Sequence, residues 1–204
     1  MYHAADQHRL SPAEFVRNPN RGHASVYFFD SPKNDRRFGI FGVVAFSHLL
    51  LAEGNPEILS YLPSRPPKEK SEKKYKQTVD VLYQSGKTEC WHFNHSRNGE
   101  PTRHKNRITK TEGEIRMAQW LPHNWMLLCS YRTRVRGAID PNPRALPGLI
   151  SARSSFTLQE VLALEDCDPA HLLASVARYL ANGKLKTELR TSAFHRRSLL
   201  ERVE

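Results

Sequence analysis

Residues 78–94 decide the fold that this sequence predicts, and they read TVDVLYQSGKTECWHFN. Residues 78–83 and 88–94 are rich in β-branched and aromatic side chains, which are typical of β-strands. The Gln-Ser-Gly-Lys sequence between them suits a hairpin turn. Because side chains alternate along a strand, Trp91 and Phe93 share one face of the second strand. The stretch therefore predicts an antiparallel hairpin with one apolar face.

The residues before this hairpin predict an arm, a helix and a further strand. We expect an N-terminal arm over residues 1–37, in which the apolar run 26–29 forms a short strand. Over residues 41–52 the apolar side chains recur at intervals of three and four, the spacing of one helix face. A Gly-Asn-Pro sequence then favours a helix end, and residues 58–62 favour a strand.

The residues after the hairpin predict a crossover to another strand. Residues 111–114 read Thr-Glu-Gly-Glu, a capping box, so a short helix is expected up to Leu121. Residues 125–131 form an apolar run that favours a buried strand. Strand, helix and strand in this order predict a parallel crossover. We therefore expect an α/β core over residues 38–140, with a mixed sheet and flanking helices.

The C-terminal part of the chain has a different composition. Three prolines and a glycine mark an expected linker over residues 141–155. Residues 168–183 predict a helix with an Asp-Pro start and an Asn-Gly end. A wing-like strand is expected over residues 184–189, and a basic final helix over 192–203. Residues 156–204 therefore predict a small helical region that resembles a winged helix.

The charge of the chain points to a polyanionic partner. Lys and Arg outnumber Asp and Glu by 31 to 21, which gives a net charge of +10. The excess is concentrated in three windows, residues 65–76, 97–110 and 132–144. Basic residues gathered in this way are typical of proteins that bind nucleic acid. The alternative is that these loops only keep the chain soluble. A membrane surface is disfavoured because no basic stretch also forms an amphipathic helix.

Several other classes of protein lack support in the sequence. Cys90, Cys129 and Cys167 are widely spaced and form no Cys-x-x-Cys pair, which argues against a disulfide framework or a cysteine zinc site. The first ten residues contain no apolar core of a signal peptide, so we expect a cytoplasmic location. No phosphate-binding loop, dinucleotide fingerprint or nucleophile elbow is present.

Several short segments follow the order of elements in a known family. Residues 78–82, Thr-Val-Asp-Val-Leu, are similar to that family's Thr-Pro-Asp-Phe-Leu strand, and Trp-His-Phe-Asn at 91–94 stands where the family has Val-Glu-Val-Lys. Further similar segments are residues 16–22, 29–34, 38–62 and 172–189. Through these segments the chain resembles the TnsA-type endonuclease subunit of heteromeric transposases. The resemblance implies a restriction-endonuclease-like core followed by a C-terminal helical region.

The resemblance also implies a catalytic set that this chain has largely lost. In such nucleases acidic side chains hold Mg²⁺ and a lysine orients or activates the attacking water. Here Asp80 is retained, but the helix glutamate corresponds to Gly42, the second strand acid to His92 and the lysine to Asn94. Imidazole is a poor Mg²⁺ ligand, and an amide carries no positive charge. Asp80, His92 and Asn94 are therefore expected to be remnants, with Asp80 the single candidate metal ligand.

These observations predict a DNA-binding, catalytically inactive TnsA-like subunit of a transposition complex, without a cofactor. By resemblance, its partners would be a DDE-type transposase and an AAA+ ATPase regulator that docks on the C-terminal region. One alternative is an active Mg²⁺-dependent endonuclease that uses Asp80 with Glu53 or Glu89. Another is a winged-helix-type regulator. The expected phosphate contacts are Lys68, Lys70, Lys73, Lys74, Lys76, Arg103, Lys105, Arg107, Arg132, Arg134 and Arg136.

Overall fold

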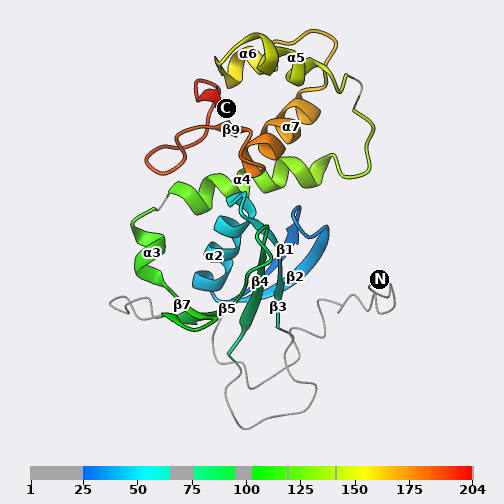
Figure 1. Ribbon diagram of the computed structural model, residues 1–204. Coiled ribbons are helices and arrows are strands. Elements are labelled where there is room, and N and C mark those ends of the chain that lie inside the picture. The colour runs from blue at the N-terminus through cyan, green and yellow to red at the C-terminus, as the bar shows by residue number, and fades with distance from the viewer. Residues whose placement is uncertain (1–24, 65–75, 95–102, 119, 141, 204) are drawn as a thin grey trace.

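The computed structural model describes five ranges of the 204-residue chain, namely residues 25–64, 76–94, 103–118, 120–140 and 142–203. The arm segment at residues 16–22 and most of the window at 65–76 lie outside these ranges. Figure 1 shows an α/β core and a mainly helical C-terminal part, with helix α4 between them. No helix in the described ranges has the length and apolar character needed to cross a membrane.

A five-stranded sheet forms the centre of the core, with the strand order β3-β4-β5-β7-β6. Its strands are β3 Ile58–Pro63, β4 Thr78–Tyr83, β5 Thr88–Asn94, β6 Arg103–His104 and β7 Arg107–Thr111. Strand β5 runs parallel to β7 and antiparallel to β4. The predicted mixed α/β sheet is therefore confirmed, and the predicted hairpin forms with the expected bounds.

The two faces of this sheet have different surroundings. On the inner face, Val79, Val81 and Trp91 are buried beneath helix α2, Val43–Gly54. The His48 ring of this helix lies 6.5 Å from the Trp91 ring, measured between centroids. On the other face, which we call the open face, the strands present Asp80, Cys90 and His92. Trp91 is buried between the half-buried Cys90 and His92, and the Phe93 ring lies 6.2 Å from the His48 ring, so Trp91 and Phe93 share the face beneath α2 as predicted.

A second hairpin occupies part of the expected N-terminal arm. Strands β1 Val26–Ser31 and β2 Arg36–Phe41 pair along their full length, so residues 26–37 are not a simple arm. The buried Gln77 side chain joins this hairpin to the main sheet, because it accepts from the Phe41 amide at 2.9 Å and donates to Gly39 O at 3.0 Å. The hairpin is thereby fixed beside the start of α2.

Residues 125–131 lie in a helix, so the prediction of a strand there was wrong. Helix α3, Glu112–Arg116, begins with the predicted capping box, and helix α4, Trp120–Arg134, follows it. Trp125, Leu128 and Cys129 are buried, whereas Met126 is 46% exposed, which is the pattern of one buried helix face. The Trp125 ring lies so close to the α2 terminus that a Cβ atom on Gly54 would stand 1.9 Å from it. Glycine is therefore required at position 54 for α2 and α4 to meet.

The C-terminal part combines three helices with a three-stranded antiparallel sheet in the order β8-β10-β9. Its elements are α5 Ala145–Ala152, β8 Ser155–Thr157, α6 Leu158–Leu162, α7 Pro169–Ala181, β9 Leu185–Lys186 and β10 Leu199–Arg202. Helix α5 lies in the expected linker and buries Leu146 and Ile150, one helical turn apart. The expected final helix is absent from residues 192–203, because Leu200 is fully buried in strand β10.

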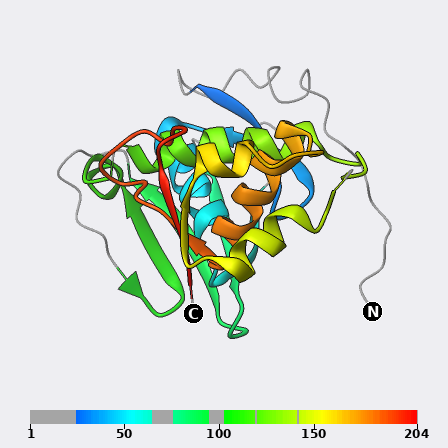
Figure 2. The ribbon, with the colours of Figure 1, turned by 90° about the horizontal axis from the view of Figure 1, so that it is seen from above.

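Helix α4 connects the core with the C-terminal part. It packs against α2 on one side and against α7 on the other, as the two views in Figures 1 and 2 show. The buried Asn124 amide of α4 donates to Leu189 O at 2.9 Å and to Ser192 O at 2.8 Å, and it accepts from the Phe194 amide at 2.8 Å. These bonds fix the connection between β9 and β10 against the core.

Candidate functional site

Asp80 lies on the open face of the main sheet. In β4 it stands between the buried Val79 and Val81, and its own side chain is exposed. The register of the strands places it directly opposite Cys90 of β5, and His92 follows two residues later on the same face. The structure thus brings Asp80, Cys90 and His92 together on one surface.

The Cys90 thiol contacts its polar neighbours on this surface. Its Sγ atom lies 3.8 Å from Nε2 of His92. Burial raises the pKa of Cys90, and Asp80 raises it further through a hydrogen bond and its negative charge, while Arg107 acts in the opposite direction. A raised pKa keeps the thiol protonated at neutral pH, whereas the thiolate is the nucleophile and the metal ligand. Cys90 is therefore poorly suited to covalent catalysis.

Gly42 and Asn94, the other two positions of the expected catalytic set, supply neither an acid nor a positive charge. Gly42 precedes helix α2 with φ of 84°, a conformation that glycine adopts readily and other residues rarely do. The backbone conformation therefore explains why glycine stands at position 42. Asn94 ends β5 opposite Thr111 of β7 and carries a neutral amide. At these two positions Asp80 is therefore accompanied by neither a glutamate nor a lysine.

Glu89 lies on the inner face of the sheet, away from Asp80. Its side chain is 4% exposed and accepts hydrogen bonds from Lys87 Nζ at 2.7 Å, from the Tyr83 hydroxyl at 2.7 Å and from Trp91 Nε1 at 3.0 Å. Burial alone would raise the pKa of Glu89, but these hydrogen bonds and the Lys87 charge lower it to about 2. The carboxylate is thus held ionised by its own neighbours and does not face Asp80.

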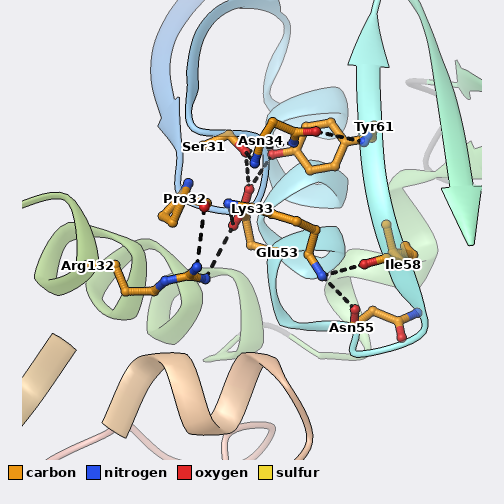
Figure 3. Close-up of polar contacts among 9 residues, drawn as sticks. All are labelled: Ser31, Pro32, Lys33, Asn34, Glu53, Asn55, Ile58, Tyr61 and Arg132. Carbon is orange, nitrogen blue, oxygen red and sulfur yellow. Dashed lines mark hydrogen bonds and ion pairs between the residues drawn. The ribbon is translucent and has the colours of Figure 1, made fainter. Parts of the chain in front are cut away.

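Glu53 is fully buried at the end of helix α2, where it joins several elements (Figure 3). Its carboxylate accepts from the Ser31 hydroxyl, from the Lys33 amide at 3.0 Å and from the Tyr61 hydroxyl at 2.7 Å. Arg132 Nη1 of α4 lies 3.9 Å from the same carboxylate. Burial and the Glu53 charge raise the pKa of Tyr61, so its phenol stays a donor. We call Glu53 and these four partners the Glu53 cluster.

The Glu53 cluster connects the β1–β2 turn, α2, β3 and α4. Lys33 Nζ donates to Asn55 O at 2.9 Å and to Ile58 O at 2.6 Å, so it closes the connection from α2 to β3. Arg132 Nη2 donates to Pro32 O at 3.3 Å, and Figure 3 shows this side chain reaching from α4 to the turn. Since the β1–β2 turn, α2, β3 and α4 meet here, Glu53 is a structural residue and does not lie on the surface as a solvated helix residue would.

The acidic residues named by the alternative hypothesis therefore lie apart from each other. Asp80 stands on the open face, whereas Glu89 and Glu53 lie on the inner side of the sheet. Within the described ranges, no group of three or more His, Cys, Asp or Glu side chains is placed to hold a metal ion. Among the described residues of β4 and β5, the open face offers one carboxylate, one protonated thiol and one imidazole, which is not the paired-oxygen arrangement that Mg²⁺ prefers.

The basic residues expected to contact phosphates fall into two groups. Lys76, Lys105 and Arg107 are exposed on or beside the main sheet, and Arg107 lies opposite Cys90 in the β5–β7 register. Arg103 begins β6, and its side chain is not described. The structure does not describe Lys68, Lys70, Lys73 and Lys74.

The second basic group lies at the end of α4, away from the sheet surface. Arg134 and Arg136 are exposed there, and Arg136 Nε pairs with Asp35 at 3.0 Å. Arg132 is only 18% exposed and belongs to the Glu53 cluster. Arg132 is therefore not one of the exposed cations at this end of α4, because its guanidinium contacts Glu53 and Pro32 O. A phosphate contact by Arg132 stays a prediction.

Two segments, residues 65–75 and 95–102, are attached to the same end of the sheet. Residues 65–75 leave after β3 and return before β4, where the Ser64 amide donates to Thr78 O at 2.8 Å. Residues 95–102 leave after β5, and the antiparallel register places Thr78 opposite His92 near this point. The topology thus brings both attachment points together beside the open face.

The chain matches no protein-family model, no curated protein and no solved structure. The functional interpretation therefore depends on the residues and geometry described above.

Reasoning from the sequence missed the Glu53 cluster and the hairpin that carries Ser31 and Lys33. One signal for it was present in the sequence. Glu53 continues the series Ala45, Leu49 at intervals of four, so the helical periodicity itself places it on the buried face. No comparable signal identified Arg132 as its partner, because that contact joins residues 79 positions apart.

Proposed function

We propose that this protein is a DNA-binding subunit with an endonuclease-like core that does not cleave DNA. The observation that carries the proposal is the open face, where Asp80 is the one carboxylate among the described residues of β4 and β5 and exposed basic residues lie on the same sheet. Arg107 stands opposite Cys90 in the β5–β7 register, Lys76 lies just before β4, and the basic segment 65–75 is attached at the edge of this face. Exposed cations attract a polyanion, whereas the described residues of this face do not supply the paired carboxylates that hold Mg²⁺ for phosphodiester cleavage.

The finer assignment is to a TnsA-like subunit of a transposition complex, with a restriction-endonuclease-like core. It rests on the similar segments in the sequence, and the mixed sheet with flanking helices is compatible with it. The C-terminal order helix-strand-helix-helix-strand-strand resembles a winged helix. A DDE-type transposase and an AAA+ ATPase regulator would be its protein partners, and DNA would be the nucleic acid that it binds.

The burial of helix α7 favours this reading over a stand-alone winged-helix regulator. In a helix-turn-helix module the last helix enters the major groove with one face. Here Leu172, Val176 and Leu180 are buried, and Ala174 and Ala181 on other sides of α7 are buried as well, with α4 packed alongside. The helix that would read DNA is thus covered by the core, so we assign DNA contact to the main sheet.

The salt dependence of DNA binding tests this proposal. If six to eight phosphates are neutralised, the logarithm of the association constant should fall with the logarithm of salt concentration at a slope of roughly −5 to −7. Replacing both Lys76 and Arg107 with Gln should reduce the slope by about 2 units, since each phosphate contact contributes roughly 0.9. The matched control is Lys186→Gln, an exposed lysine on β9 that pairs with Glu201. Equal losses in the two proteins, or a slope near zero, would contradict the proposal.

A further inference from the structure

A small cleft separates the β1–β2 turn from helices α4 and α7. Its volume is about 180 Å³, and it is lined by Asp35 and by three arginines, Arg132, Arg136 and Arg178. The β1–β2 turn that lines the cleft contacts Asn55 and Ile58, at the start of β3. Lys76 of the proposed DNA-binding surface comes after the other end of β3, just before β4. The cleft is therefore separate from the open face to which we assign DNA binding.

Arg132 lies close enough to Arg136 and to Arg178 to be repelled by their positive charges. Burial lowers the pKa of Arg132, and the charges of Arg178 and Arg136 lower it further, while Glu53 opposes this effect. Glu53 and Asp35 each pair with one arginine, Arg132 and Arg136 respectively. Arg178 is exposed, and no described carboxylate forms an ion pair with it. One positive charge of the cleft is thus left without a counter-charge among the described residues.

We propose that this cleft binds a single phosphate group. Guanidinium donors match the geometry of phosphate oxygens and form charge-assisted hydrogen bonds with them. The volume is below the roughly 300 Å³ of the smallest usual small-molecule pockets, which favours one oxyanion over a whole nucleotide. Bound phosphate would bridge α4 and α7 and relieve the repulsion among the three arginines.

Two substitutions with opposite expected effects test the site. Isothermal titration of the full chain with inorganic phosphate, against chloride at equal ionic strength, measures the affinity. Arg178→Gln removes the uncompensated guanidinium, so affinity should fall about tenfold. Asp35→Asn removes the competing carboxylate, so affinity should rise severalfold. Asn also tolerates the φ of 48° at this position. Arg197→Gln, at an exposed arginine outside the cleft, is the control and should bind as the unaltered chain does.

A labelled DNA duplex distinguishes the source of the phosphate. If a backbone phosphodiester occupies the cleft, Arg178→Gln should reduce the salt slope of DNA binding by about 0.9. If the ligand is free phosphate, DNA binding is unchanged while phosphate titration still responds to Arg178→Gln and Asp35→Asn. The proposal is overturned if inorganic phosphate binds no better than chloride, or if both cleft variants bind it like the unaltered chain. Either result would leave DNA binding at the open face unaffected.

Discussion

The carboxylates on the two sides of the main sheet have opposite surroundings. Glu53 is completely buried and engaged by Ser31, Lys33, Tyr61 and Arg132, whereas Asp80 is exposed on the open face. A buried carboxylate with this many partners holds elements together, because removing it would leave several polar groups unsatisfied. An exposed carboxylate contributes little to stability, so Asp80 is not needed to hold the fold together. The contrast suggests that the inner side of the core maintains the fold and the open face provides its function.

Replacing Glu53 or Asp80 with Ala gives the largest expected difference in stability between a residue of the inner side and a residue of the open face. Glu53→Ala should destabilise the protein by about 3–5 kcal/mol, since it leaves Arg132 and two hydroxyl groups without their acceptor. Asp80→Ala should change stability by no more than about 0.5 kcal/mol. Urea unfolding followed by circular dichroism measures both. Glu53→Gln, which retains volume without the charge, should fall between them. Similar losses of stability for Glu53→Ala and Asp80→Ala would contradict the distinction between a structural inner side and a functional open face.

Glu89 extends the comparison to acid pH. Its pKa of about 2 in the folded protein lies below the ordinary value of 4.5, so ionised Glu89 stabilises the fold above pH 4.5. This stabilisation should be lost as the pH falls from 4.5 towards 2. Glu89→Gln should cost about 1–3 kcal/mol at neutral pH and flatten this part of the stability profile. An unchanged acid profile in Glu89→Gln would show that its hydrogen bonds contribute nothing measurable.

The smallest expected effect is that of His48 on the pH dependence of stability. His92 on the open face is the matched control. Burial lowers the pKa of His48 below 6.5, although its bond to Thr111 O at 2.9 Å and the Glu114 charge oppose this. Because the unfolded chain binds the proton more readily, stability is fully present above pH 6.5 and falls as the pH decreases towards the folded pKa. Urea midpoints between pH 7.5 and 5.5 should show this decline. It should disappear in His48→Gln and persist in His92→Gln, and the reverse pattern would contradict the assignment.

The elements that could be predicted from the sequence are those in which local pattern and tertiary contacts agree. The hairpin Thr78–Asn94 has strand propensity, alternation and turn residues that all favour one structure, and it formed with the expected bounds. The predicted capping box at Thr111 also marks a real helix start. The prediction of a strand at residues 125–131 was wrong because consecutive apolar residues there indicated burial on all sides. In the structure only one face of helix α4 is buried.

The candidate site was predictable only in part. Alternation along β5 placed His92 and Cys90 on one face, and the hairpin register then placed Asp80 beside them. The Glu53 cluster and the arginine cleft depend on contacts between segments far apart in the chain. Arg132 meets Pro32 across 100 positions, and Arg136 meets Asp35 across a similar span. Sequence spacing carries no information on such contacts, so Arg132 was grouped with the surface cations around it.

Incubation of supercoiled plasmid with the purified protein and Mg²⁺ or Mn²⁺ tests the central claim most directly. The account predicts that the protein retards the plasmid on a gel while the DNA stays supercoiled, and that Asp80→Ala behaves in the same way. Nicked or linear product that Asp80→Ala abolishes would contradict it, since the open face would then hold a working metal site.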